Sequence, residues 1–594
     1  MSTIGADLGS GEVRSLPDAL RLRSRLQPEQ TAYVFLRNGE EPAASLTYGQ
    51  LDLAARVRAG YLVAAGLAGG SVVLLYPSGL EFVRSLLGCM YAGVAGAPVQ
   101  VPRRRQGLAR LRRVADDAGT TTVLTTTAVK RELEENFADA PELAGLTLVD
   151  TTLLPVTLAH GWCYVSPPAE GVALLQYTSG STGDPKGVVI THANFAANAA
   201  ETDELWPCGE DARVVSWLPL FHDMGLLFGV VLPLWAGVPS YLMEPEAFIR
   251  RPARWLEAVS RFRGTHAAAP SFAYELCVRA AREGGVGAEL DLSSWRVAAN
   301  GAEPVRRQTV QAFAEAFAPL GFAARAMCPG YGLAENTLKV TGSPQTREPG
   351  VLWLAAEGLR EGRAEPVGET APGAVPLVSS GVTVPGTVVR IVDPESRVAR
   401  PDGRVGEIWV DGPCVGAGYR GRPEESELTF RARIAGEETG RYLRTGDLGL
   451  LHEGELYVTG RLKDVIIRQG RNYYPQDVEL SAEGAVPGLH PNCAAAFSVE
   501  ADGADGTDGA GGRERLVVLV EADGRVLKQP GLRELRKRVR DAIWENQRLE
   551  ADEIVVLRRG ALSRTSSGKV QRRLCRSRYT GGELAQAIVS GGEE

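Results

Sequence analysis

Lysine is scarce in this chain of 594 residues. Lys and Arg together number 65, yet only seven of them are lysine, so arginine supplies most of the positive charge. The lysines stand at positions 130, 186, 339, 463, 528, 537 and 569. A compact ammonium can move onto a single oxygen atom, which the planar fork of arginine cannot do. Scattered lysines are usually solvated surface residues, but Lys186, Lys463 and Lys569 stand in glycine-containing, loop-like contexts and are candidates for a function.

Cysteine is present but never in close pairs. The eight cysteines are Cys89, Cys163, Cys208, Cys277, Cys328, Cys414, Cys493 and Cys575. A zinc site or a redox dithiol needs cysteines a few residues apart, and this chain has no such spacing. We therefore expect reduced thiols that are mostly packed inside the protein.

The chain also lacks a long hydrophobic run, a secretory signal and a strong net charge. Its most apolar stretch, residues 224–239, is interrupted by glycine and proline and is too short to span a bilayer, so we expect it to be buried core. The amino terminus has no apolar segment behind a basic start, which predicts a cytoplasmic location. A net charge of -7 is small for this length and gives no electrostatic footprint for nucleic acid. We expect no nucleic-acid partner and no membrane span.

The length and the order of elements predict more than one domain, because 594 residues exceed what one hydrophobic core supports. Patterns typical of amphipathic helices repeatedly precede short apolar strands, an alternation that favours helices packed on largely parallel sheets. Short β-branched runs separated by Gly, Asp and Pro predict a β-rich subdomain over residues 375–457. We predict an α/β fold, with a large multi-sheet amino-terminal domain over 1–462 and a small, mobile α+β lid over 463–594.

The clearest local signal is YTSGSTGDPKGVVITH, at residues 177–192. Glycines let backbone N–H groups turn toward phosphate oxygens, and hydroxyl groups and a lysine add donors and charge. The residues concerned are Thr178, Ser179, Gly180, Ser181, Thr182, Gly183 and Lys186. A flexible hydrophilic turn is the alternative. The stretch is not the common P-loop, because Pro-Lys-Gly is followed by the strand-like VVI rather than by Ser or Thr and a helix.

Five motifs in a fixed order carry a resemblance to a known family. They are YTSGSTGDPKG, YGLAENTL, YLRTGDLG, GRLKDVI and SSGKVQRR, and they are similar to the signature set of the adenylate-forming superfamily. Within it, SWLPLFHDMGL, NGAEPVR, YGLAENTL and RNYYPQDVE most resemble the fatty acyl-AMP ligases. Those enzymes pass the acyl group to the phosphopantetheine of a carrier protein rather than to coenzyme A. The match covers nearly the whole chain.

The resemblance implies an ATP site with bound Mg²⁺. Residues 178–183 and Lys186 would hold the β and γ phosphates, and Gly301, Ala302 and Glu303 would border the adenine. The remaining contacts would be Tyr331 stacking on the purine, Asp447 and Arg461 on the ribose, Thr337 donating to the α-phosphate, and Glu335 binding Mg²⁺. Tyr331 could instead be ordinary core, and TGDLG around Asp447 could be a simple tight turn.

The resemblance also implies which residues act on the acid. Lys569 is the predicted catalytic residue, together with Thr337, because an ammonium stabilises the charge that develops on phosphoryl oxygens. His222 and Gly332 are the predicted substrate-binding residues, although a lone histidine between apolar segments is as often a satisfied core residue. Lys463 falls where the family hinges its lid between two catalytic poses.

The sequence carries fewer signals for the acyl acceptor than for the adenylation step. Residues 342–378 are long and poor in regular pattern, and an insertion near this place in fatty acyl-AMP ligases restrains the lid and disfavours coenzyme A. A long surface loop would explain the segment equally well. We expect transfer of a fatty acid to an acyl carrier protein supplied as a separate chain. The alternatives are an acyl-CoA ligase, an enzyme for a non-fatty carboxylic acid, and a catalytically silent nucleotide-binding protein.

Overall fold

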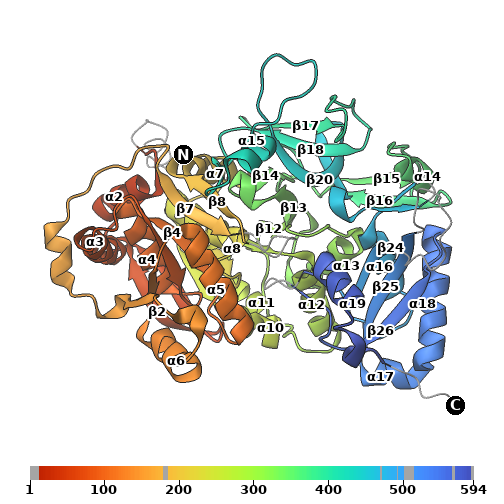
Figure 1. The fold of residues 1–594 in the computed structure, drawn as a ribbon, viewed down its shortest axis with the longest axis horizontal. Helices are drawn as coiled ribbons and strands as arrows, with labels where there is room; N and C mark the ends of the chain where they lie inside the picture. Colours follow the sequence, from red (N-terminus) through yellow and green to blue (C-terminus); the bar gives the residue numbers. More distant parts are fainter. Residues whose placement is uncertain are drawn as a thin grey trace.

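The structure is a computed structural model that describes residues 13–177, 185–384, 386–468, 471–490, 492–500, 514–564 and 569–589. These residues form two large sheets and several smaller ones, with helices packed on their faces (Figure 1). Most neighbouring strands of the two large sheets run parallel. The predicted α/β class is confirmed.

The first large sheet has eight strands in the order β14-β13-β12-β11-β9-β10-β1-β2. Its strands are β1 (Thr31–Arg37), β2 (Glu41–Thr47), β9 (Val214–Ser216), β10 (Ser240–Met243), β11 (His266–Ala269), β12 (Val297–Asn300), β13 (Met327–Gly332) and β14 (Lys339–Gly342). The strands β10, β9, β11, β12 and β13 run parallel, so their carboxyl ends share one edge. In open α/β sheets ligands bind outside that edge.

The second large sheet has seven strands in the order β19-β8-β7-β4-β3-β5-β6. Its strands are β3 (Ser71–Leu75), β4 (Ala95–Val99), β5 (Thr122–Thr125), β6 (Thr147–Asp150), β7 (Val172–Tyr177), β8 (Gly187–Thr191) and β19 (Gly418–Tyr419). All five residues of β3 are buried, as a parallel strand covered on both faces requires. Val72 and Leu74 join the largest core, whereas Val73 and Leu75 face a second core.

Helices cover both faces of these sheets. They include α2 (Leu16–Leu26), α3 (Tyr48–Ala64), α4 (Leu80–Tyr91), α5 (Arg105–Ala118), α6 (Thr127–Phe137), α7 (His192–Leu205), α10 (Pro245–Arg250), α11 (Ala253–Phe262), α12 (Ser271–Arg282) and α13 (Arg307–Phe317). Figure 1 shows α3 and α4 on one side of the second sheet. The side chains of α3 and α4 fill the largest core, which joins the two sheets, and those of α5 fill the second.

The apolar stretch 224–239 is buried core, as predicted. It forms α8 (Asp223–Leu226), a π-helical turn over Leu227–Val231 and α9 (Leu232–Ala236). Every residue from Met224 to Trp235 is buried. Among the described residues, no helix is long and apolar enough to cross a membrane.

Smaller sheets follow in the second half of the chain. One of them is an antiparallel sheet of four strands: β17 (Val388–Val392), β18 (Gly406–Asp411), β20 (Leu443–His452) and β21 (Glu455–Arg461). The helix α15 (Pro423–Phe430) contacts β20 of this sheet. Residues 342–378, expected to be poor in regular structure, instead contain a hairpin of β15 (Val351–Ala355) and β16 (Ala374–Val378) with α14 (Ala356–Arg360) between them. The alternative of a long surface loop is therefore wrong, because VLWLA and AVPLV pair residue by residue.

The region from β22 onward packs around its own sheet. Its elements are β22 (Ile466–Arg468), β23 (Arg471–Tyr473), α16 (Pro475–Glu483), β24 (Ala494–Glu500), β25 (Glu514–Ala522), α17 (Gly524–Val526), α18 (Leu532–Gln547), β26 (Glu553–Arg558) and α19 (Arg572–Thr580). Alternate residues of β25 face two cores, one shared with α16 and α18 and the other with α19. Both cores contain only residues from 466 onward. The boundary at 463 remains a prediction, and these cores are the observation that supports it.

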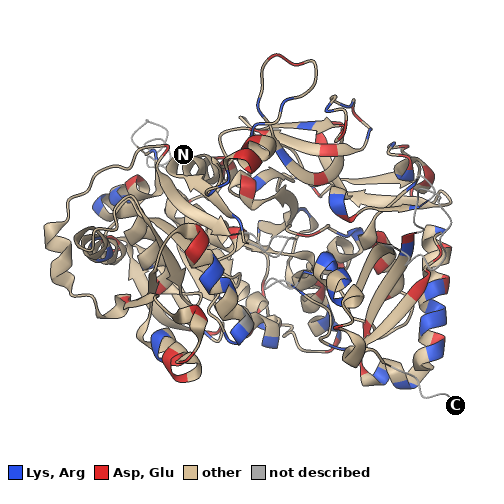
Figure 2. Ribbon diagram, in the orientation of Figure 1, with Lys and Arg blue, Asp and Glu red and all other residues tan. Residues whose placement is uncertain are grey.

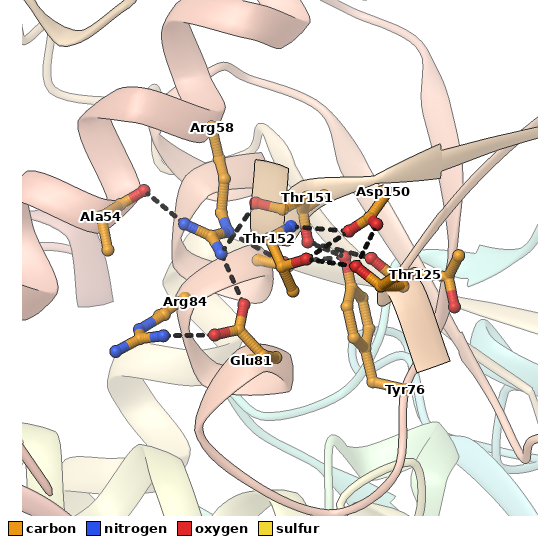
Figure 3. Close-up of polar contacts among 11 residues, drawn as sticks. Ala54, Arg58, Tyr76, Glu81, Arg84, Thr125, Asp150, Thr151 and Thr152 are labelled. Carbon is orange, nitrogen blue, oxygen red and sulfur yellow. Dashed lines mark hydrogen bonds and ion pairs between the residues drawn. The ribbon is translucent and has the colours of Figure 1, made fainter. Parts of the chain in front are cut away.

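A polar network ties the long connection after β6 to the second sheet (Figure 3). The Arg58 guanidinium on α3 donates to the Glu81 carboxylate at 2.6 Å and to the Thr151 carbonyl at 3.4 Å. Thr151 donates its hydroxyl to the Thr125 carbonyl at 3.1 Å, and the Tyr76 and Thr151 hydroxyls lie 2.9 Å apart. Because the buried polar groups satisfy one another, the network is a structural one.

Charged side chains of both signs are interspersed over the ribbon (Figure 2). The most continuous basic row lies along α18, at the right edge of the view. Arg533, Lys537 and Arg540 on that helix are exposed.

Candidate active site

One cavity of about 1690 Å³ lies where the first sheet, the β17–β21 sheet and the carboxyl-terminal region meet. Its lining includes twelve predicted site residues: Lys186, His222, Gly301, Ala302, Glu303, Tyr331, Gly332, Glu335, Asp447, Arg461, Lys463 and Lys569. Residues more than 380 positions apart in the sequence thus share one space. The predicted phosphate-binding residues Thr178, Ser179, Gly180, Ser181, Thr182 and Gly183 lie outside the described residues.

Tyr331, Asp447 and Arg461 form a connected group on three strands. Tyr331 on β13 donates its hydroxyl to Asp447 Oδ2 at 2.8 Å, and Arg461 Nε lies 3.2 Å from Asp447 Oδ1. Asp447 and Arg461 are direct partners in the β20–β21 register, so the sheet itself sets their distance. The Asp447 carboxylate raises the pKa of Arg461. The arrangement presents an aromatic face beside a charged acceptor, which are the groups that a nucleoside needs.

Gly301, Ala302 and Glu303 follow the carboxyl end of β12, at the ligand-binding edge of the sheet. A Cβ atom on Gly301 would lie 2.8 Å from the Gly330 carbonyl oxygen, so only glycine fits there. Ala302 has φ of +69°, in the left-handed region that an alanine rarely occupies. Glu303 Oε1 accepts the Phe272 backbone N–H at 2.7 Å, which fixes this segment to the first turn of α12.

The turn after β13 carries Glu335 and Thr337. Glu335 lines the cavity, and its Oε1 accepts the Tyr419 hydroxyl at 2.9 Å. Burial raises the pKa of Glu335. Thr337, with φ of +62°, is a strained position for a β-branched residue, and its hydroxyl donates to the Cys414 carbonyl at 2.7 Å. Thr337 is absent from the described lining of the cavity, and its catalytic role stays a prediction.

Glu335 supplies a carboxylate of the kind that binds magnesium. A Mg²⁺ ion commonly takes one or two carboxylates and completes its shell with phosphate oxygens and water. Among the described residues, no group of three or more His, Cys, Asp or Glu side chains could hold a metal ion. An ion at Glu335 would therefore draw its other ligands from the nucleotide and from water.

Lys186 stands at the same end of the cavity as Glu335. Its ammonium forms an ion pair with Glu425 of α15 and lies 5.3 Å from the centre of the Tyr419 ring. Tyr419 thus contacts both Lys186 and Glu335. A phosphate arriving here would compete with the Glu425 carboxylate for the ammonium.

His222 lies beside Asp223, a residue that the sequence analysis did not select. His222 Nδ1 is 2.6 Å from Asp223 Oδ1, which also accepts the Met224 backbone N–H at 2.7 Å. Burial favours the neutral acid, but His222 and Lys569 outweigh it, so the pKa of Asp223 lies below its usual value. The sequence did hold one signal for Asp223: it follows His222 at the start of a helix, and aspartate is a preferred residue for the first turn and the cap of a helix.

Lys569 reaches the cavity from the carboxyl-terminal region. Burial and, to a smaller extent, the Arg461 guanidinium lower its pKa, while the carboxylates of Asp223, Glu303 and Asp447 act in the opposite direction. The ammonium therefore lies among groups contributed by three separate segments of the core. Lys463, in a short 3₁₀ turn (Leu462–Asp464) directly after β21, lines the same cavity.

The core and the carboxyl-terminal region contact each other through residues that sequence reasoning missed. Arg306, just after Glu303, donates to Glu483 of α16 at 3.0 Å. Arg360 of α14 donates to the Gln547 carbonyl at 2.8 Å and lies 5.3 Å from the centre of the Tyr473 ring. No local sequence pattern marks these pairs, because their partners lie more than 110 positions away.

Comparison with known proteins identifies the family. The AMP-binding enzyme family matches residues 20–420. The medium-chain-fatty-acid–[acyl-carrier-protein] ligase JamA of Moorena producens is 41% identical over 582 residues, covering 97% of this chain and 96% of that protein. The chain belongs to the fatty acyl-AMP ligases, within the AMP-binding enzyme family.

Two further members of the family have informative names. The fatty acyl-adenylate ligase of Legionella pneumophila, solved in complex with acyl adenylate and pyrophosphate, is 35% identical with a TM-score of 0.74 and covers 98% of both chains. The 4-hydroxyphenylalkanoate adenylyltransferase of Mycobacterium marinum is 36% identical, covering 95% of this chain and 91% of that protein. Membership of this family makes a nucleotide the expected ligand of the cavity.

Proposed function

We propose that this protein uses ATP to convert a fatty acid into its acyl-adenylate and then transfers the acyl group to a separate acyl carrier protein. In the first step a carboxylate oxygen attacks the α-phosphorus, the bond to the bridging oxygen breaks, and pyrophosphate leaves. In the second step the phosphopantetheine thiolate attacks the acyl carbonyl, a thioester forms, and AMP leaves. The named activities of the relatives support both steps.

The placement of Lys569 is the observation that carries the proposal. Its ammonium lines the same cavity as Tyr331 and His222, and it feels the carboxylates of both Asp447, the partner of Tyr331, and Asp223, the neighbour of His222. Charge accumulates on the phosphoryl oxygens in the transition state, and a preorganised cation stabilises that charge more than it stabilises the ground state. An ionised acid is already a nucleophile, so no general base is needed.

The other site residues bind and orient. Tyr331 stacks on the adenine, Asp447 accepts the ribose hydroxyls, and Glu303 fixes the segment that borders the base. Lys186 exchanges Glu425 for the β and γ phosphates, together with the hydroxyl-rich loop at residues 178–183. His222 and Gly332 shape the space for the acid carboxylate, and Thr337 donates to the α-phosphate.

A magnesium ion held by Glu335 would neutralise part of the phosphate charge. The fit is supported by the carboxylate facing the cavity and by the hydroxyl of Tyr419, which orients its Oε1. Tyr419 leaves the second carboxylate oxygen for another ligand.

A moving lid is part of the proposal. We assign residues 1–462 to the adenylation core and 463–594 to the lid, with Lys463 at the hinge. The separate hydrophobic cores after residue 466 and the cavity-facing position of Lys463 support this division. After adenylation the lid would rotate and withdraw Lys569 from the cavity, so that the thiol could reach the acyl carbonyl.

The hairpin β15–α14–β16 supports a carrier protein as the acceptor. It holds the lid at two points, since Arg360 contacts Gln547 and Tyr473, and Glu357 pairs with Arg471 at 2.7 Å. These contacts would limit the orientations that the lid can adopt, including those in which free coenzyme A could reach the adenylate. The eight cysteines, all unpaired, fit a cytoplasmic setting for this chemistry.

The test is ATP–pyrophosphate exchange with a panel of fatty acids and Mg²⁺, followed by mass spectrometry of the product. We expect exchange with at least one acid, free acyl-adenylate without an acceptor, and acyl-carrier protein when a phosphopantetheinylated carrier is added. Substantial acyl-CoA under the same conditions would select the coenzyme A alternative. Failure of every carboxylic acid to support exchange would overturn the proposal.

A further inference from the structure

Lys339, on β14, is a buried cation that the proposed chemistry does not use. Its side chain is 4% exposed, and it lines the cavity together with Trp206 and Thr341. Lys339 and Thr341 alternate along the strand and so share one of its faces. Of the seven lysines in the chain, four line this cavity, and Lys339 is the one among them that has no role in the proposed chemistry.

The ammonium of Lys339 is only partly satisfied by protein groups. It donates to the Glu201 carbonyl at 3.0 Å and lies 4.9 Å from the centre of the Trp206 ring. Among the described residues, no carboxylate forms an ion pair with it, and the Glu201 carboxylate is itself engaged by the Thr387 hydroxyl at 3.1 Å. An ammonium has three N–H donors, so this one retains hydrogen-bonding capacity inside the protein.

Several apolar side chains line the cavity together with Lys339. Trp206, Phe228 and Met224 line the same cavity, and the rings of Trp206 and Phe228 are 5.9 Å apart. A hydrocarbon chain matches these side chains but offers the amino group of Lys339 no hydrogen bond beyond the one to the Glu201 carbonyl. A buried N–H donor left unsatisfied is costly, and a site that contains one discriminates strongly against ligands that lack an acceptor.

We propose that Lys339 makes this ligase selective for an aliphatic acid that carries a neutral hydrogen-bond-accepting oxygen, a hydroxyl or a ketone, on its chain. The inference rests on the proposed function and specifies its substrate class. The Lys339 amino group, which has N–H donors in both its charged and its neutral form, donates to that oxygen while the rest of the chain packs against Trp206 and Phe228. Lys339 is therefore a specificity-determining residue rather than a catalytic one.

The oxygen is neutral because negative charge is already present near the ammonium. Burial lowers the pKa of Lys339 to about 7, while Glu201 and Glu204 act in the opposite direction. A carboxylate on the substrate chain would be repelled by these two residues. A hydroxyl or ketone oxygen accepts the hydrogen bond without adding charge.

The experiment compares decanoate with hydroxydecanoates that carry the hydroxyl at successive positions, using ATP–pyrophosphate exchange by the full chain. We expect kcat/KM for at least one hydroxydecanoate to exceed that for decanoate by tenfold or more. In Lys339→Met, which keeps the length of the side chain but removes the donor, this ratio should fall at least tenfold. Lys339→Gln keeps an N–H donor, so its ratio should lie between those of wild type and Lys339→Met.

The matched control is Lys537→Met, which removes an exposed lysine on α18 and should keep the wild-type ratio. Thermal unfolding of each variant shows whether it is folded. The ratio of kcat/KM for hydroxydecanoate to kcat/KM for decanoate is also measured with the wild-type enzyme, so this part of the test does not depend on the folding of any variant. The inference is overturned if wild-type enzyme prefers decanoate over every hydroxydecanoate, if decanedioate is the best substrate, or if folded Lys339→Met keeps the ratio. Exchange with decanoate in those cases leaves the proposed function standing, whereas exchange with no acid overturns both.

Discussion

Tyr331 donates its hydroxyl to the Oδ2 atom of Asp447 at 2.8 Å, although 116 positions separate them in the sequence. The bond joins β13 of the eight-stranded sheet to β20 of the antiparallel sheet. It also fixes the distance between the proposed adenine platform and the proposed ribose acceptor. A rigid nucleoside site follows, because each group is held by the other and by its own strand.

Replacing Asp447 by Asn should weaken ATP binding about 10–100-fold. Hydrogen bonds to charged groups are worth about 1.5–3 kcal/mol, and about 1.4 kcal/mol corresponds to a factor of ten. Isothermal titration of ATP against wild-type and Asp447→Asn protein measures the change. Tyr331→Phe keeps the aromatic face and loses one hydrogen bond, so its effect should be smaller. Equal ATP affinity in wild type and Asp447→Asn would remove Asp447 from the nucleoside site.

Replacing Lys569 by Ala should strongly slow acyl-adenylate formation but leave ATP binding largely intact. Removing one group that stabilises charge in the transition state lowers kcat by about 10²–10³-fold. We expect that loss in acyl-adenylate formation, measured by rapid quench, with the ATP dissociation constant changed less than about threefold.

The control for Lys569 is Lys528→Ala, which removes an exposed lysine from the same region and should keep full activity. Lys569→Ala with wild-type kcat would show that the ammonium does not act on the phosphate. A loss of ATP affinity equal to the loss of kcat would instead make Lys569 a binding residue.

Sequence motifs predicted the strands and turns of the site better than they predicted its contacts. The sequence around Asp447 and around Arg461 has a pattern typical of β-strands, so their placement on adjacent strands could be predicted locally. Two contacts could not be predicted in this way: the ion pair of Lys186 with Glu425 and the hydrogen bond of Tyr419 to Glu335. Both depend on how distant segments of the chain pack. The hairpin at 342–378 was missed because its two short strands are separated by a helix and a turn-rich stretch. Strain at Ala302 and Thr337 has no sequence signature, since neither residue type favours a positive φ.

The pair Arg306–Glu483 should control how well the lid docks for adenylation. Arg306 Nη1 is 3.0 Å from Glu483 Oε2, and both side chains are largely buried. Removing either partner leaves the other charge buried and unpaired, which is more costly than losing both. We expect Arg306→Ala and Glu483→Gln each to slow acyl-adenylate formation about tenfold.

A double-mutant cycle tests this coupling. The variant with both substitutions should be no slower than the worse single variant, because the interaction is lost only once. Arg279→Ala, at an exposed contact with His490 of the lid, serves as the comparison and should have little effect. Additive losses in the double variant would show that the two residues act independently of each other.

The stability of the folded protein should rise with pH through Lys339. The pKa of Lys339 is lowered by burial to about 7, whereas in the unfolded chain it returns to its ordinary value near 10.5. Between these values the unfolded state binds one more proton than the folded state, so raising the pH favours folding by about 1.4 kcal/mol per pH unit. Below pH 7 the lysine is charged in both states, and the burial penalty is present in full.

Lys339→Met removes this titration. The pH dependence of stability that comes from the other titratable groups is the same in both proteins and cancels when the two are compared. The melting temperature of wild type minus that of Lys339→Met should therefore increase by about 1–2 °C per pH unit between pH 7 and 9. Lys537→Met, which removes an exposed lysine, should show a constant difference from wild type over the same range. A difference between wild type and Lys339→Met that stays flat or decreases would mean that the Lys339 ammonium remains charged in the folded protein.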